Sequence, residues 1–85
     1  MHKIPRDTSG KDLAKLLKKK YGYCFERESG SHMRLASKYK GLEHKITIPG
    51  HDGIKIGTLN NILKDISIYL GISKDELVKE LFENK

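Results

Sequence analysis

The sequence predicts a single α+β domain in which helices cover one face of a three-stranded antiparallel sheet. Three observations lead to this fold class. The chain has 85 residues, which leaves room for one small hydrophobic core. Apolar residues recur at helical spacing towards both ends. Three strand-like runs lie between them, joined by connections short enough to favour antiparallel neighbours. The expected order is therefore α-β-β-β-α, with an additional short helix at the end.

The first helix is predicted over about residues 9–20. Leu13, Leu16 and Leu17 follow the i, i+3, i+4 spacing of a helix face that packs on a core. Ser9 is a capping residue for its first turn, and Gly22 ends it. The opposite face of this helix is strongly basic, because it carries Lys11, Lys15, Lys18 and Lys19.

The three strands are predicted over residues 23–28, 31–37 and 44–48, and glycine-containing turns separate them. Successive side chains of a strand point to opposite faces of the sheet. The apolar set, which should pack on the helices, is Met33, Leu35, Ile46 and Ile48. The set expected on the open face is His32, Arg34, Lys45 and Thr47.

The second helix is predicted from Gly57-Thr58 to Gly71, with Thr58 as its expected cap. A capping-box pattern at Ser73 and Glu76 then starts a short third helix, over about residues 74–82. Ile68 lies on the polar side of the second helix, where we expect the third helix to cover it. The second helix carries the clearest 3.6-residue stripe, formed by Leu59, Ile62, Leu63, Ile66, Tyr69 and Leu70.

The net charge of +6 is concentrated in the first half of the chain. Residues 1–45 hold 12 basic and 5 acidic residues, a net charge of +7, whereas residues 46–85 hold 5 and 6. Such a surface either attracts a polyanion such as nucleic acid or is a solvated face that aids solubility. The sequence has no transmembrane stretch and no apolar run for a signal peptide, so a cytoplasmic location is expected.

Few residues offer chemistry by their spacing. The four histidines lack metal-ligand spacing, and the lone Cys24, expected to be half-buried, cannot form an intrachain disulfide. The remaining candidate is Gly30-Ser31-His32, which would place His32 on the open face beside Arg34. An imidazole exchanges protons near neutral pH, and arginine stabilises phosphate charge. This combination suits RNA cleavage by attack of a 2′-OH, although an ordinary surface histidine also fits the pattern.

Several short motifs, taken in order, resemble the HicA-like (YcfA-like) toxins of prokaryotic toxin–antitoxin systems. The likeness begins at Ile4-Pro5 and Ser9-Gly10-Lys11, and continues through Arg27 and Gly30-Ser31-His32. It resumes at residues 46–49, His51, 55–59 and 62–63. It thus covers most of residues 4–71, which we expect to be the core of one domain spanning residues 1–85, with a helical extension over about residues 72–85.

The resemblance implies a double-stranded-RNA-binding-domain-like fold and a translation-independent mRNA interferase, which is an endoribonuclease. It identifies His32 as the catalytic residue, supported by Gly30 and Ser31, and implies no metal cofactor. A HicB-like antitoxin would be the protein partner and mRNA the substrate. Residues expected to hold RNA phosphates are Arg34, Lys45, Arg27, Lys15 and Lys19.

One residue departs from the family pattern. Glu28 stands where family members commonly carry glutamine. A carboxylate near His32 would favour the protonated imidazole or repel RNA phosphate. A non-catalytic RNA-binding module or a degenerate toxin homologue is therefore an alternative, as is a domain that binds an acidic protein.

Overall fold

The computed structural model describes residues 8–50 and 54–83, and within them the predicted order of elements is confirmed. The residue bounds are α1 (Gly10–Tyr21), β1 (Cys24–Ser29), β2 (His32–Ser37), β3 (His44–Pro49), α2 (Ile56–Leu70) and α3 (Lys74–Val78), followed by a π-helical turn, η1 (Lys79–Glu83). The chain thus forms an α+β fold with an α-β-β-β-α arrangement and a short C-terminal helix.

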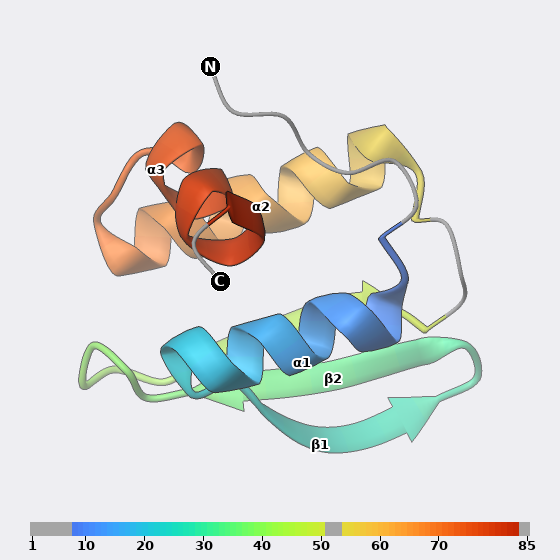
Figure 1. Ribbon diagram of the computed structural model, residues 1–85. Helices are drawn as coiled ribbons and strands as arrows, with labels where there is room; N and C mark the ends of the chain where they lie inside the picture. Colours follow the sequence, from blue (N-terminus) through green and yellow to red (C-terminus); the bar gives the residue numbers. More distant parts are fainter. Residues whose placement is uncertain (1–7, 51–53, 84–85) are drawn as a thin grey trace.

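The strands form one antiparallel sheet in the order β1-β2-β3, and α1 and α2 lie on one side of it (Figure 1). The predicted alternation is confirmed in β2 and β3. Met33, Leu35, Ile46 and Ile48 are buried against the helices. The side chains between them point to the opposite face, which no described element covers.

One hydrophobic cluster joins the sheet to the helices. Leu13 and Leu17 of α1 are fully buried, as expected from their spacing. Each such leucine contributes about 1.5–3 kcal/mol relative to an exposed side chain. Figure 1 shows α3 and η1 beside α2, on the side of α1 that faces away from the sheet. The C-terminal segment closes the core from that side with Leu77, Val78 and Leu81.

Helix ends follow the predicted residues in four places. Gly22 ends α1 in the left-handed conformation, with φ of 69°. The Oγ atom of Ser9 accepts a hydrogen bond from the backbone N–H of Asp12 at 3.1 Å. Ser73 caps α3 in the same way. Gly71 adopts the left-handed conformation after α2, with φ of 74°. The prediction for Thr58 was wrong, because α2 begins two residues earlier at Ile56 and has no side-chain cap.

Two predictions of burial were also wrong. Ile68 is 70% exposed, because α3 and η1 pack over other sides of the helices and leave this side of α2 uncovered. Cys24 is exposed rather than half-buried, because β1 is an edge strand whose six residues all reach solvent. The residue before that strand, Tyr23, is fully buried and carries the packing role instead.

Candidate functional site

The open face of the sheet collects the polar residues that the alternation predicted there. His32 is exposed at the start of β2, and Arg34 follows on the same face, half-buried. On β3, Thr47 lies directly opposite Arg34, and Lys45 lies opposite Ala36, one step further from His32. The sheet therefore presents His32 and Arg34 side by side and sets Lys45 at some distance along the strands.

A β-bulge brings Arg27 to the same face. Phe25 pairs with Leu35 and Arg27 pairs with Arg34, so Glu26 is an extra residue without a partner on β2. Strict alternation would put Arg27 and Phe25 on one side of the sheet, and the bulge lets Arg27 face the open side while Phe25 pairs with the core residue Leu35. Bulges re-aim side chains in this way beside functional sites.

The register of the β1–β2 hairpin turns Glu28 away from His32. Glu28 pairs with Met33, a core residue, whereas Ser29 pairs with His32. The carboxylate of Glu28 lies near Gly50, since a Cβ added there would be 3.8 Å from its Oε2 atom. The expectation that Glu28 lies near His32 is therefore wrong, because the two side chains lie on opposite faces of the sheet.

These residues line a small hollow of about 130 Å³ on the open face. Two guanidinium groups, one imidazole and two hydroxyl groups meet there, and a hollow of this size suits a single anionic group such as phosphate. Its lining residues are Arg27, Ser29, His32, Arg34 and Thr47.

Arg27 and Arg34 have no ion-pair partner among residues 8–50 and 54–83. Like charges placed directly opposite each other on two strands destabilise a sheet by about 0.2–1 kcal/mol. An anion between the two guanidinium groups removes this repulsion and gains charge-assisted hydrogen bonds. The hollow is therefore built to attract an anion that the described residues do not supply.

The β1–β2 turn delivers His32 to this hollow. Gly30 has φ of 61°, in the left-handed region that favours glycine. A Cβ added to Gly30 would meet no atom within 4 Å, so the glycine is required by the backbone conformation and not by space. The carbonyl of Ser31 accepts a hydrogen bond from the backbone N–H of Gly50 at 2.5 Å, which ties the turn to the end of β3.

Three residues expected to bind phosphate lie elsewhere. Lys15 and Lys19 are exposed on α1, which packs on the covered side of the sheet, so the sheet separates them from His32. Lys45 is on the open face but its Nζ atom lies 3.8 Å from carboxylate oxygens of both Glu26 and Glu43. His51, part of the family resemblance, lies outside the described residues.

A second histidine, His44, forms a polar cluster that was not predicted from the sequence. The Tyr23 hydroxyl and the Nδ1 atom of His44 share a hydrogen bond of 2.7 Å, and the Nε2 atom lies 3.4 Å from Oδ2 of Asp65. The His44 ring stacks on Tyr69, with 4.5 Å between ring centroids. Burial raises the pKa of Tyr23, and neighbouring Tyr69 and Asp65 raise it further. This cluster joins β3 to α2 on the covered side, away from His32.

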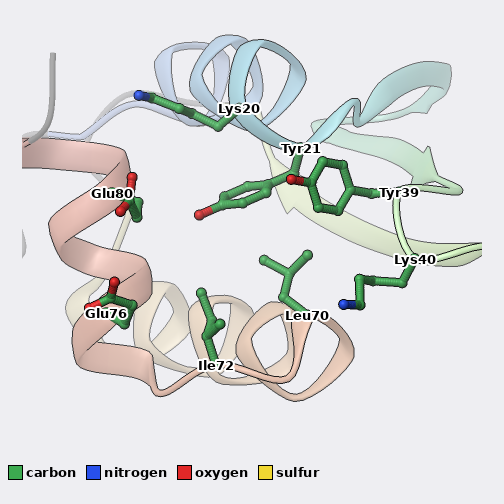
Figure 2. A pocket seen from close by; sticks show the side chains of 8 residues that line it. All are labelled: Lys20, Tyr21, Tyr39, Lys40, Leu70, Ile72, Glu76 and Glu80. Atoms are coloured by element: carbon green, nitrogen blue, oxygen red, sulfur yellow. The ribbon is translucent and has the colours of Figure 1, made fainter.

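A larger hollow of about 390 Å³ lies where α1, α2 and the C-terminal segment meet (Figure 2). Basic and acidic side chains occur in equal numbers around an apolar floor, so the hollow offers no excess charge. None of the predicted site residues lines it. The lining residues are Lys20, Tyr21, Tyr39, Lys40, Leu70, Ile72, Glu76 and Glu80. Among the residues that the structure describes, no group of three His, Cys, Asp or Glu side chains could hold a metal ion.

Comparison with known proteins identifies the family. The family model of the HicA toxin of bacterial toxin–antitoxin systems matches residues 10–68, which is more than half of the chain. The chain belongs to the HicA toxin family. No curated protein and no solved structure was matched.

Membership gives the chain a toxin role within a toxin–antitoxin pair, and so a partner that restrains it. The matched segment runs from the start of α1 almost to the end of α2. It therefore contains the whole sheet and every residue that lines the hollow around His32. In the described part of the chain, no helix combines the length and apolar character needed to cross a bilayer.

Proposed function

We propose that this HicA-family toxin is an endoribonuclease that cleaves mRNA, with His32 as its catalytic residue. The observation that carries the proposal is the hollow in which two guanidinium groups, without an ion-pair partner in the described ranges, lie beside an exposed imidazole. The arginines attract one phosphodiester group, and an imidazole is a side chain that can act as general acid or base in catalysis. A phosphate site and a proton-transfer group thus lie in one hollow of the sheet.

The chemistry follows from these groups. The 2′-oxygen attacks the adjacent phosphorus, its proton leaves, and the bond to the 5′-oxygen breaks as that oxygen gains a proton. His32 acts as general acid/base in these transfers, which contributes about 10²–10⁴-fold to a rate. Arg27 and Arg34 stabilise the negative charge that develops on the phosphate oxygens. The hydroxyls of Ser29 and Thr47 are positioned to donate hydrogen bonds to the same oxygens. None of these steps requires a metal ion.

The partners follow from the same surface. The substrate is mRNA, which meets the toxin in the cytoplasm. The hollow lies on a face that none of the described elements covers, so a separate molecule can reach it. A HicB-like antitoxin that covers this face would restrain the toxin.

The decisive experiment compares RNA cleavage by purified wild-type protein and by the His32→Ala variant. We expect the wild type to cleave single-stranded mRNA in the presence of EDTA, and the variant to lose at least about 100-fold in rate. Circular dichroism and urea unfolding check that the variant is folded, as expected for an exposed side chain. Unchanged cleavage by folded His32→Ala would falsify the assignment of the catalytic residue.

The arginines are tested separately. Arg27→Gln and Arg34→Gln should each weaken RNA binding, and Arg27→Gln should raise the free energy of unfolding slightly, by about 0.2–1 kcal/mol, because it removes like-charge repulsion. A wild-type protein that binds RNA through these arginines but does not cleave it would identify the chain as a binding module.

A further inference from the structure

We propose that Glu26 and Glu43 set the limit of the RNA-binding surface on the open face of the sheet. They do so by pairing with Lys45, so that its charge is not available to RNA phosphates. The inference rests on the proposed RNA-cleaving function and deepens it, because it determines how much of an RNA strand the toxin contacts. It also takes Lys45 out of the set of phosphate-binding residues in the wild-type protein.

The geometry around Lys45 is specific. Its Nζ atom lies 3.8 Å from Oε1 of Glu26 on β1 and 3.8 Å from Oε1 of Glu43, the residue before β3. All three side chains are partly exposed, at 49% for the lysine and 35% and 44% for the glutamates. Each of these exposed ion pairs contributes little to the free energy of unfolding. Their effect on an approaching polyanion is larger, because both carboxylates compete with phosphate for the single ammonium group of Lys45.

The open face is therefore polarised along the strands. At the end where β2 begins, Arg27 and Arg34 supply two positive charges beside His32, with no carboxylate in ion-pair contact in the described parts of the chain. One step further along the pairing register, opposite Ala36, Lys45 is paired with two carboxylates, and Lys38 lines the same hollow as Glu26 and Glu43, so this end has no excess positive charge. An RNA strand gains by crossing the three strands at the His32 end and gains nothing by running along β2 towards Lys45.

The bulge creates the boundary between the two ends. Glu26 is the extra residue of β1, and its carboxylate reaches Lys45 on the open face. Arg27 follows it and lies on the same face, beside Arg34. In a regular strand, two successive residues face opposite ways. Here the bulge places an acidic and a basic residue next to each other on one face, so the change of sign occurs within a single dipeptide.

The test measures binding of a 12-nucleotide single-stranded 2′-O-methyl RNA, which lacks the attacking 2′-OH and cannot be cleaved. Affinity is measured from low to moderate salt concentration for the wild type, Lys45→Gln, the double variant Glu26→Gln/Glu43→Gln, and the triple variant with all three substitutions. A matched control, Asp12→Asn/Glu76→Gln, removes two negative charges from exposed positions on α1 and α3, on the other side of the sheet.

The variants differ in whether Lys45 is free to bind phosphate. Each phosphate contact contributes about 0.7 to the slope of log K against log salt concentration for a single strand. Glu26→Gln/Glu43→Gln should bind at least about threefold more tightly at low salt and show a slope steeper by about 0.7. Lys45→Gln should leave affinity almost unchanged in the wild type, and should abolish the gain in the double variant. The control variant should change affinity less than twofold.

Three results would overturn the inference. The first is a loss of affinity for Lys45→Gln in the wild type as large as that for Arg27→Gln, which would make Lys45 an ordinary phosphate ligand. The second is an unchanged affinity of the Glu26→Gln/Glu43→Gln variant. The third is an equal gain for the control variant, which would show a general effect of net charge. If Arg27→Gln has no effect on binding, the proposed RNA site itself is wrong, and the inference falls with it.

Discussion

Gly10 is the position where a single methyl group should do most harm to this fold. It is the first residue of α1, it is buried, and it lies against the end of β3. A Cβ added to Gly10 would be 1.8 Å from the carbonyl oxygen of Pro49 and 3.1 Å from the Cα atom of Gly50. Real Cβ contacts essentially never fall below 3.0 Å, so Gly10→Ala requires a shift of at least 3.0 − 1.8 = 1.2 Å.

The shift cannot be absorbed by a side chain, because backbone lies on both sides of the contact. Overpacking a well-packed site costs about 1–3 kcal/mol, and a clash between backbone segments belongs at the upper end. The higher helix propensity of alanine offsets up to about 1 kcal/mol of this destabilisation. We therefore expect Gly10→Ala to lower the free energy of unfolding by about 2 kcal/mol or more. For a small protein this is a large part of its total stability.

Urea unfolding followed by circular dichroism measures the effect. With an m value of about 1 kcal/mol/M, a loss of 2 kcal/mol lowers the midpoint by about 2 M. The matched control is Gly57→Ala in the first turn of α2, where an added Cβ meets no atom within 4 Å and φ is not positive. It should stabilise the protein by about 0.4–1 kcal/mol. The reasoning is refuted if Gly10→Ala is as stable as the wild type, or if Gly57→Ala is equally damaging.

Three further predictions follow from single contacts. Glu28→Gln should leave the RNA cleavage rate within about twofold of the wild type, because Glu28 pairs with the core residue Met33 and faces away from the hollow; a change of tenfold or more would contradict this orientation. Burial, Tyr69 and Asp65 raise the pKa of Tyr23 above its ordinary value of 10.0, so this hydroxyl ionises at lower pH in the unfolded chain than in the folded protein. The free energy of unfolding should therefore fall above pH 10. Urea unfolding at pH 9, 10 and 11 should show a decline of up to about 1.4 kcal/mol per pH unit from this group, and Tyr23→Phe should make the decline shallower. Ser37→Ala should cost about 1–3 kcal/mol, because its buried Oγ donates to the Tyr21 carbonyl at 2.7 Å and accepts from the backbone N–H of Tyr39 at 3.0 Å; an unchanged urea midpoint would show that the serine is dispensable.

Much of the fold was readable from local patterns. The spacing of Leu13 and Leu17 identified the buried face of α1, and strict alternation in β2 placed Met33 in the core and His32 on the open face. These patterns are reliable because the period of a helix or strand fixes which side chains share a face. Helix ends were less predictable. Thr58 looked like a cap, but α2 begins at Ile56, with Lys55 in the N-cap position.

The candidate site was predicted in part. The short Gly30-Ser31-His32 turn and the order of the family motifs indicated His32, and parity added Arg34. The role of Glu28 was misjudged, because closeness in the chain does not fix the face of a sheet: Ser29 pairs with His32, so Glu28 pairs with Met33 and faces the other side. The bulge at Glu26 could not be predicted either, because a bulge depends on pairing with a neighbouring strand.

The sequence by itself determined the order of the elements, the buried face of the helices and the exposure of His32, since each depends on periodicity within one segment. Only the tertiary structure decided which charges surround that histidine. It placed Arg27 beside Arg34, held Lys45 between two carboxylates, and put Lys15 on the other side of the sheet. These positions depend on contacts between residues far apart in the chain. A helix and a strand each define their own faces, but only packing defines which faces meet.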